Sequence, residues 1–347
     1  MSGLTVLTAA DVDRVIQDID LEAALTGQSA VFQAYSSGSP GTGNVPAIQT
    51  PQRLSIQSEK ATSLFMPARV YAQGTACKIV SVPKAGGTDG LPGTTLIMDD
   101  EGRIKGIVNA RKLTALRNAC GSALFLRSCP SNKPPTNLLI FGSGAQAHSH
   151  ASVFVRLFPS INTIRLAVRS ANDRAKALAE TLSTTFPGVS VELVKTTENG
   201  QKTDLSAQVG SADIIVTVTS STEALFPSEH VTAGTRLILI GSYTPKMREV
   251  DDALILRAGV IAVDSKEACG HEAGELLSAG IGADKLVELG ALVAAEDART
   301  SVGKGGDVVV FKSVGLGIQD VAIAKLVFDD ALRRGLGTHI AAYDGAE

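Results

Sequence analysis

The sequence has few cysteines and no spacing that would pair them or bind a metal with them. Its 347 residues include four, Cys77, Cys120, Cys129 and Cys269, which are scattered without a C-x-x-C motif. This distribution argues against a disulfide framework and against a zinc site. We therefore expect all four to be buried as small hydrophobic residues, in a cytoplasmic protein without a bound metal.

The sequence also lacks a basic run, a long hydrophobic run and a secretory signal. The net charge is −3 and the pI is near 6.0, which gives no electrostatic basis for nucleic-acid binding. No apolar run reaches the roughly 18 residues of a membrane-spanning helix. The acidic segment 1–20 has neither the basic nor the apolar region of a secretory signal. We expect a globular protein with no nucleic-acid or membrane partner.

The first third of the chain predicts a helix followed by an antiparallel sheet. Thr8 is a good N-cap for a helix over residues 8–26, and Gly27 is expected to end it. Residues 36–46 are rich in Ser, Gly, Pro and Thr, which predicts a surface loop. Strand-like runs then alternate with turn residues, and they cover residues 53–57, 63–70, 76–82, 94–98 and 104–108.

The rest of the chain predicts a parallel sheet. A long helix is expected over residues 110–127, and after it strands alternate with helices. Repeated strand–helix units favour an open α/β sheet with right-handed crossovers. Strands are expected at residues 138–141, 163–168, 189–194, 212–219, 236–241, 259–263 and 308–311, and further helices at 172–183 and 318–332.

A glycine-rich turn follows the first of these strands. Gly142, Gly144 and Ala147 are spaced as G-x-G-x-x-A before an amphipathic segment. Between a strand and a helix, this pattern is typical of a turn that holds a dinucleotide pyrophosphate, which accepts hydrogen bonds from the free N–H groups of the helix N-terminus. We expect Ala145 and Gln146 to contribute to the same site.

The end of the next strand indicates which dinucleotide binds. An NAD site usually has an acidic residue there, about 20 residues into the motif, for the ribose 2′-hydroxyl. This chain has Arg169 and Ser170 instead, and with Arg174 they would bind a 2′-phosphate through charge-assisted hydrogen bonds. The prediction is NADPH. The alternative is that Arg169 is a solvent-exposed residue and that NADH is used.

Three cationic residues lie within apolar stretches of the first 118 residues. They are Arg53, Lys78 and Arg117. A charged side chain in such a stretch either faces water or meets an anion, since unpaired burial is costly. Each alone is interpreted as a surface charge, whereas the three together predict a clamp for a carboxylate. Asp320, on the last expected helix, is interpreted as a local cap or pair.

Eight short motifs follow one another along the chain. They are Met66-Pro67-Ala68, Gly74 with Cys77-Lys78, Gly-Leu-Pro at 90–92, Leu-Thr-Ala-Leu-Arg at 113–117, Gly-Ser-Gly-Ala-Gln-Ala at 142–147, Gly-Ser-Tyr-Thr-Pro at 241–245, Gly-Glu-Leu at 274–276 and Lys-Ser-Val-Gly at 312–315. In this order they make the chain resemble the ornithine cyclodeaminase and mu-crystallin family over about residues 50–325.

The resemblance implies a fold, an assembly and a set of site residues. The fold is an NAD(P)-binding Rossmann domain, expected over residues 119–317. It is inserted in a substrate-binding and dimerisation domain formed by residues 1–118 and 318–347, and the assembly is a homodimer. The resemblance raises the expectation that Arg53, Lys78 and Arg117 bind a substrate carboxylate. Met66 and Tyr243 are further expected at the substrate, and Thr219, Ser242, Ser313 and Gly315 at the cofactor.

One departure from the family pattern bears on the reaction. Ornithine cyclodeaminases have Asp where this chain has Tyr243, and a phenol with a pKa near 10 does not replace a carboxylate at neutral pH. We therefore expect an NADPH-dependent reductase of a cyclic ketimine or imino acid. The alternatives are an amino acid or opine-type dehydrogenase, a cyclodeaminase-like lyase, and a ligand-binding protein of the mu-crystallin type that keeps its cofactor.

Overall fold

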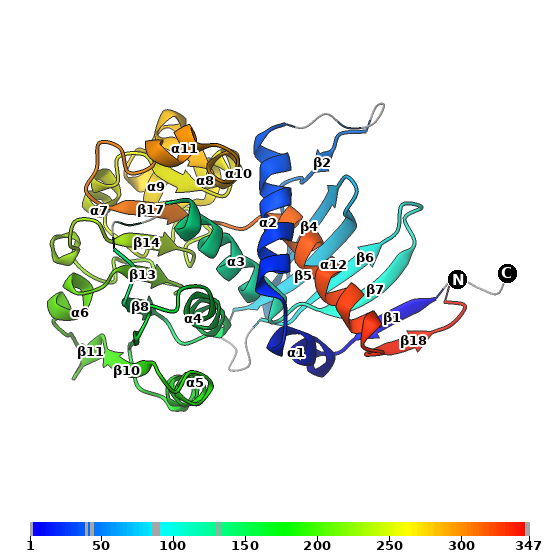
Figure 1. Ribbon diagram of the computed structural model, residues 1–347, viewed down its shortest axis with the longest axis horizontal. Coiled ribbons are helices and arrows are strands. Elements are labelled where there is room, and N and C mark those ends of the chain that lie inside the picture. Colours follow the sequence, from blue (N-terminus) through cyan, green and yellow to red (C-terminus); the bar gives the residue numbers. More distant parts are fainter. Residues whose placement is uncertain are drawn as a thin grey trace. The chain divides into compact units, whose positions relative to one another are not determined.

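The computed structural model describes residues 3–38, 41, 45–84, 91–129, 131 and 133–343. The chain divides into two compact units, the first formed by Met1–Arg117 and Leu316–Glu347 and the second by Asn118–Gly315 (Figure 1). Gly90 and much of the loop expected at 36–46 lie outside the described residues.

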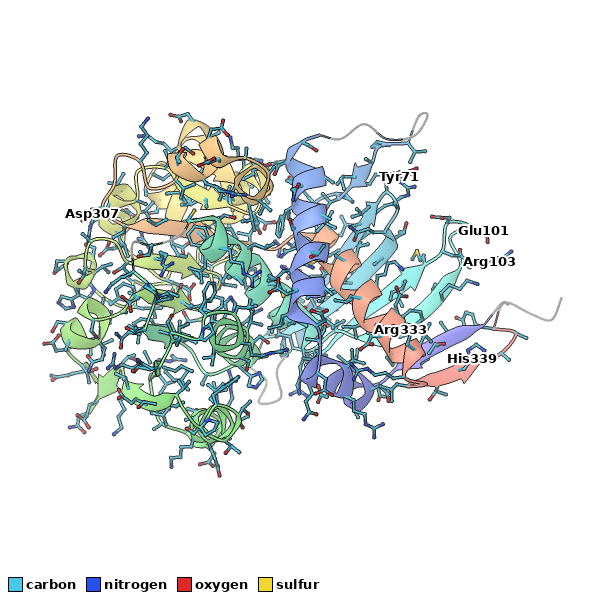
Figure 2. The ribbon with its side chains drawn as sticks, in the orientation of Figure 1. Tyr71, Glu101, Arg103, Asp307, Arg333 and His339 are labelled. Atoms are coloured by element: carbon cyan, nitrogen blue, oxygen red, sulfur yellow. The ribbon has the colours of Figure 1, made fainter. Side chains whose placement is uncertain are left out.

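The first unit is built on a mostly antiparallel sheet. Its strand order is β18-β1-β7-β6-β5-β4-β2, and β3 also pairs with β4. β1 is parallel to β7 and antiparallel to β18, where the Thr5 hydroxyl lies 3.3 Å from Nδ1 of His339 (Figure 2). The strands are β1 (Leu4–Leu7), β2 (Ile48–Gln49), β3 (Leu54–Gln57), β4 (Ala61–Val70), β5 (Gly74–Pro83), β6 (Gly93–Met98), β7 (Ile104–Asn109) and β18 (Thr338–Ile340).

The helix expected over residues 8–26 is two helices, α1 (Ala9–Gln17) and α2 (Leu21–Ser36). Thr8 caps α1 as expected, but Asp20 begins a second helix by accepting hydrogen bonds from the N–H groups of Glu22 and Ala23. Gly27 does not end the helix. A glycine costs about 1 kcal/mol inside a helix, and here α2 packs against another helix, α12 (Gly317–Arg333), which outweighs that cost.

Helix α12 covers one face of the sheet together with α2 (Figure 1). Two glycines allow α12 to lie close to the strands of the sheet. A Cβ on Gly317 would lie 3.0 Å from that of Ala68 on β4, and one on Gly106 of β7 would lie 2.6 Å from the Phe328 ring. Alternate strand residues point toward the helix, because side chains alternate between the faces of a sheet. Met66 and Lys78, directly opposite each other on β4 and β5, are both buried on this face.

The second unit is a doubly wound parallel sheet, as the sequence predicts. The order is β10-β9-β8-β13-β14-β17-β15-β16, with all neighbours parallel. A separate small hairpin joins β11 (Thr197–Glu198) to β12 (Gln201–Lys202). The sheet strands are β8 (Asn137–Phe141), β9 (Thr163–Val168), β10 (Ser190–Lys195), β13 (Ile214–Thr217), β14 (Arg236–Leu239), β15 (Ile261–Val263), β16 (Leu286–Glu288) and β17 (Val309–Lys312).

Helices connect these strands, and one long helix precedes the first of them. The helix expected at 110–127 begins three residues later, as α3 (Leu113–Ser128). The others are α4 (Ala145–Leu157), α5 (Asp173–Thr185), α6 (Ser206–Gly210), η1 (Ser228–His230), α7 (Asp252–Arg257), α8 (Lys266–Glu272), α9 (Gly274–Ser278), η2 (Ala283–Lys285), α10 (Leu289–Ala294) and α11 (Glu296–Ser301).

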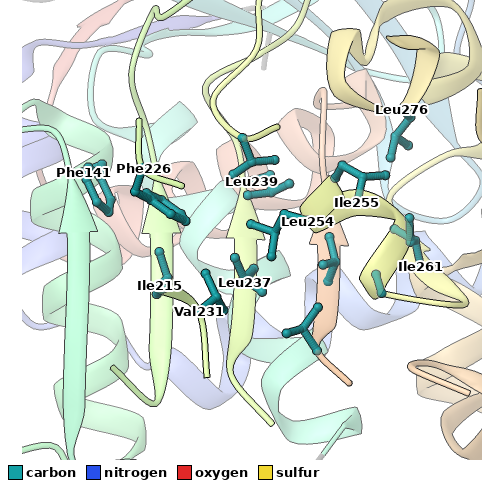
Figure 3. Close-up of a cluster of buried hydrophobic side chains, with 14 of the residues drawn as sticks. Phe141, Ile215, Phe226, Val231, Leu237, Leu239, Leu254, Ile255, Ile261 and Leu276 are labelled. Carbon is teal, nitrogen blue, oxygen red and sulfur yellow. The ribbon is translucent and has the colours of Figure 1, made fainter. Parts of the chain in front are cut away.

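The core of the second unit lies against the middle strands of its sheet. Ile215, Leu237 and Leu239 pack there with residues of α7 (Figure 3). The rings of Phe141 and Phe226 have centroids 4.9 Å apart. This packing fixes the carboxyl ends of the strands, where ligands bind in open α/β sheets.

Candidate active site

A cluster of buried charges lies on the covered face of the first unit's sheet. The Lys78 ammonium is 2.8 Å from Oδ2 of Asp320, and Nε of Arg117 is 3.5 Å from Oδ1 of the same carboxylate. Lys78 comes from β5, Arg117 from α3 and Asp320 from α12. Their exposed fractions are 2%, 3% and 2%. The interpretation of Asp320 as a local cap or pair is therefore wrong, since its partners are far away in the sequence.

Gln319 fixes the orientation of Arg117. Its side-chain oxygen accepts a hydrogen bond of 2.7 Å from Nη1 of Arg117, and also one of 3.1 Å from the N–H of Leu316. Its amide nitrogen lies 3.4 Å from the Arg117 carbonyl, and Gln28 donates to the carbonyl of Gln319. The sequence analysis did not name Gln319 and gave Asp320 only a local role. The available signal was that these two polar residues directly precede the apolar run 321–324 of α12.

The environment of Lys78 makes its ammonium unusually acidic. Burial lowers its pKa to about 8, the positive charges of Arg117 and Arg53 lower it as well, and the Asp320 carboxylate opposes them. A lysine with a pKa near the working pH can donate a proton and regain it. Whether Lys78 donates a proton to a substrate stays a prediction.

The structure brings together the substrate residues expected in the first unit. Arg53 precedes β3 and its charge acts on Lys78, while Met66 pairs with Lys78 across the strands. Tyr243 belongs to the second unit, where it is half-buried against the hydrophobic core. Whether these residues bind a substrate stays a prediction.

The glycine-rich turn has the geometry that a pyrophosphate requires. Gly142 has φ +128°, and a Cβ there would lie 3.0 Å from the Val218 side chain, so other residues would be strained. Gly144 is the N-cap of α4 and no side chain caps the helix, which leaves its first N–H groups for an anion. Ala145 is exposed and Ala147 is fully buried. Gln146 has a side-chain oxygen with no hydrogen-bond partner.

The cationic residues expected at a 2′-phosphate follow β9. Arg169 and Ser170 are exposed directly after the strand, and no acidic residue stands between the strand and α5. Arg174, on α5, donates a hydrogen bond of 3.0 Å from Nε to the carbonyl of Ser143. It therefore lies across the glycine-rich turn, and a Cβ on Gly144 would meet its guanidinium at 2.7 Å.

The other expected cofactor residues lie in loops after the strands. The hydroxyl of Ser242, which is fully buried, donates to the carbonyl of Met247. Asp264 holds the segment after β17, because Oδ2 accepts hydrogen bonds from the Ser313 hydroxyl at 2.7 Å and from the N–H of Gly315 at 2.6 Å. Thr219, after β13, contacts the buried carboxylate of Glu249. Their role at a cofactor stays a prediction.

The described residues contain neither a candidate metal site nor a candidate membrane-spanning helix. In that part of the chain no group of three or more His, Cys, Asp or Glu side chains could hold a metal ion. Over the same residues, no helix is both long enough and apolar enough to span a membrane.

The parallel sheet and its glycine-rich turn define a Rossmann-type α/β protein. The chain belongs to the ornithine cyclodeaminase/mu-crystallin family, whose model matches residues 5–335. The resemblance of the eight motifs is thereby confirmed.

Two relatives and one solved structure are similar to the chain over most of its length. Ketimine reductase mu-crystallin of Mus musculus is 32% identical over 240 residues, 68% of either protein. Delta(1)-pyrroline-2-carboxylate reductase of Bacillus cereus is 30% identical over 321 residues, 89% of this chain and 91% of that protein. The structure of Thermococcus litoralis Delta(1)-pyrroline-2-carboxylate reductase in complex with NADH and L-proline has a TM-score of 0.81 at 22% identity, covering 97% of this chain and 100% of that one. The last likeness confirms the fold.

We expect Asp320→Ala to destabilise the protein strongly. It would leave the Lys78 and Arg117 charges buried without their carboxylate, and removing one partner of a buried pair costs about 3 to 5 kcal/mol. Thermal unfolding measures the loss. The control is Asp329→Ala on the same helix, whose ion pair with Lys325 is exposed and contributes roughly 0.5 kcal/mol or less. Equal decreases of the unfolding temperature in the two variants would contradict a structural role of the buried cluster.

Proposed function

We propose that the protein is an NADPH-dependent reductase of a cyclic ketimine or imino acid, of the pyrroline- or piperideine-2-carboxylate type. The observation that carries the proposal is the buried cluster in which Asp320 pairs with both Lys78, whose pKa is about 8, and Arg117, with the charge of Arg53 also acting on Lys78. Such a cluster offers a binding site for a carboxylate and a proton for an imine. The names of the two relatives, a ketimine reductase and a pyrroline-2-carboxylate reductase, support it.

The cations assign a role to each end of the substrate. Arg53 and Arg117 hold its carboxylate, because a guanidinium can donate two parallel hydrogen bonds to it. Lys78 donates a proton to the imine nitrogen, which makes the neighbouring carbon electrophilic. A bound nicotinamide supplies the hydride for that carbon. Addition of one proton and one hydride gives the cyclic amino acid.

Asp320 keeps Lys78 charged until the substrate has bound. Burial and two neighbouring cations favour the neutral amine, and only the carboxylate favours the ammonium. Gln319 also holds Arg117 through a hydrogen bond, which keeps the guanidinium in place for a substrate carboxylate. Asp320 and Gln319 therefore act on the substrate indirectly, through Lys78 and Arg117.

The cofactor proposal rests on the residues around the glycine-rich turn. Gly142 and the uncapped start of α4 fit a pyrophosphate, and Arg169, Ser170 and Arg174 fit a 2′-phosphate better than a free hydroxyl. NADPH is therefore proposed over NADH.

Tyr243 favours reduction over cyclodeamination. Its side chain packs against the hydrophobic core of the second unit and offers no carboxylate. The experiment that tests the function is an NADPH-oxidation screen with pyrroline-2-carboxylate, piperideine-2-carboxylate, thiazoline carboxylates, and pyruvate with ammonia. Turnover of pyruvate only with ammonia would indicate an amino acid dehydrogenase. Binding of cofactor without turnover of any of them would indicate a ligand-binding protein.

A homodimer is proposed through the sheet face opposite α12. Leu54 and Ile56 of β3 are 66% and 63% exposed. They lie two residues apart in the strand and therefore on one face of the sheet. Their cross-strand partners on β4 are Phe65 and Ser63. Exposed aliphatic side chains that share a sheet face are typical of a protein interface.

We expect the pH dependence of turnover to follow Lys78. The rate should be constant at neutral pH and fall as the pH rises through about 8, because only the ammonium form donates a proton. Lys78→Met should lower kcat about 100-fold or more, measured in steady-state assays beside the exposed control Lys84→Ala. A raised KM with unchanged kcat would restrict Lys78 to binding the carboxylate.

We expect Arg169→Asp to reverse the cofactor preference. Loss of a charge-assisted hydrogen bond to the 2′-phosphate should raise the KM for NADPH roughly tenfold or more. The new carboxylate can accept a hydrogen bond from the ribose 2′-hydroxyl of NADH. Steady-state kinetics with both cofactors measures it, and Lys176→Asp, an exposed charge change on α5, is the control. A lower KM for NADH in the wild-type protein would refute the NADPH assignment.

We expect Ile56→Asp to convert a dimer into a monomer. A carboxylate at this position would have to be desolvated in the interface. Size-exclusion chromatography with light scattering gives the mass, and Ser55→Asp, on the opposite face of the same strand, is the matched control. A monomeric wild-type protein would argue against the dimer.

A further inference from the structure

Glu249 is a fully buried carboxylate beneath two of the loops expected to hold the cofactor. Oε1 accepts hydrogen bonds from the N–H and the hydroxyl of Thr219, at 2.6 and 2.7 Å. Oε2 accepts from the hydroxyl of Thr217 at 2.8 Å and from the N–H of Gly241 at 2.7 Å. All these donors belong to the carboxyl ends of β13 and β14 or directly follow them. One side chain therefore joins the ends of two neighbouring strands.

Further buried groups tie Glu249 to a third strand. Its own N–H donates to Glu275 at 3.1 Å, and Glu275 forms an ion pair of 3.4 Å with Lys312 at the end of β17. Lys312 also donates to the carbonyl of Ser242 at 2.5 Å. A Cβ on Gly241 would lie 2.1 Å from the Thr219 carbonyl oxygen. Buried hydrogen bonds and one ion pair therefore join the ends of three strands.

The donors around Glu249 determine how the Thr219 hydroxyl points. Burial holds the pKa of Glu249 above its ordinary value, although Lys312 and the hydrogen bonds oppose this shift. Each carboxylate oxygen faces one backbone N–H, which can only donate, so the ionised form satisfies every neighbouring donor. The Thr219 hydroxyl then donates its hydrogen to Glu249. Of the two lone pairs on that oxygen, one accepts a hydrogen bond of 3.2 Å from the N–H of Ser221, and the other is left for a ligand donor.

We propose that Glu249 is a positioning residue for the cofactor, and that the Thr219 hydroxyl it orients accepts a hydrogen bond from the nicotinamide nucleoside. The inference rests on the proposed function, since it needs a nicotinamide dinucleotide in the crevice at the carboxyl ends of the strands. That half of the dinucleotide has two kinds of donor, the carboxamide NH₂ and the ribose hydroxyls. Glu249 itself does not contact the ligand.

The first experiment compares Glu249→Gln with Glu229→Gln, an exposed glutamate of the same unit. Glutamine replaces one oxygen by an NH₂ group, which leaves a backbone N–H facing another donor. We expect the Kd for NADPH, measured by calorimetric titration, to rise about tenfold or more, and Glu229→Gln to bind as the wild type does. A folded Glu249→Gln protein with the wild-type Kd would overturn the positioning role.

The second experiment tests the orientation of Thr219 and does not depend on how well Glu249→Gln folds. Wild type, Thr219→Val and Thr219→Ser are titrated with NADP⁺ and with its 3-acetylpyridine analogue, in which a methyl group replaces the carboxamide NH₂. If the carboxamide is the donor, the wild type binds NADP⁺ more tightly than the analogue and Thr219→Val abolishes the difference. If a ribose hydroxyl is the donor, Thr219→Val weakens both equally. Thr219→Ser should restore binding in either case.

Two outcomes of the second experiment also count against the inference, and they differ from failure of the proposed function. Unchanged affinity of Thr219→Val for both dinucleotides, or failure of Thr219→Ser to restore binding, would overturn the acceptor role. A wild-type protein that binds neither NADPH nor NADH would remove the proposed function itself.

Discussion

The buried ammonium of Lys78 is the constraint on which the first unit depends. A charged group with 2% exposure is tolerated only beside an opposite charge, and the chain supplies that charge from Asp320 on its last long helix. Helix α12 must therefore pack closely on the sheet, and Gly317 and Gly106 provide the space for it. The same ion pair that permits burial also favours the ammonium form of Lys78, so one contact serves both the stability of the unit and the proposed role of Lys78.

The second unit uses buried carboxylates for a different purpose. Glu249 and Asp264 accept hydrogen bonds from loop residues at the carboxyl ends of the parallel strands. These loops would otherwise present unpaired N–H groups in the interior, which is costly. The hydrogen bonds to Glu249 and Asp264 therefore set the orientation of the polar groups in these loops.

Local patterns predicted most of the fold, and the misses have physical reasons. The glycine-rich turn could be predicted because a tight turn and the close approach of backbone to a pyrophosphate both require small residues. The strands could be predicted because their hydrophobic pattern depends on neighbouring residues alone. Strands β1 and β18 were missed because they are short and form through pairing that is distant in the sequence. Gly27 was interpreted as a helix end because its packing against α12 is tertiary. Arg53, Lys78 and Arg117 were recognisable as costly charges, whereas their partner Asp320 was not, because only the folded chain brings it to Lys78.

The position of α12 in the chain has a consequence for biosynthesis. The second unit is continuous, Asn118–Gly315, whereas the first needs Leu316–Glu347 to be complete. Domains generally fold as units while the chain is being made. The inserted unit can therefore fold on the ribosome, while Lys78, synthesised early, has no counter-ion until the last helix emerges. Until then the sheet of the first unit exposes the face that α12 will cover, and that interval is when the nascent protein most needs protection from aggregation.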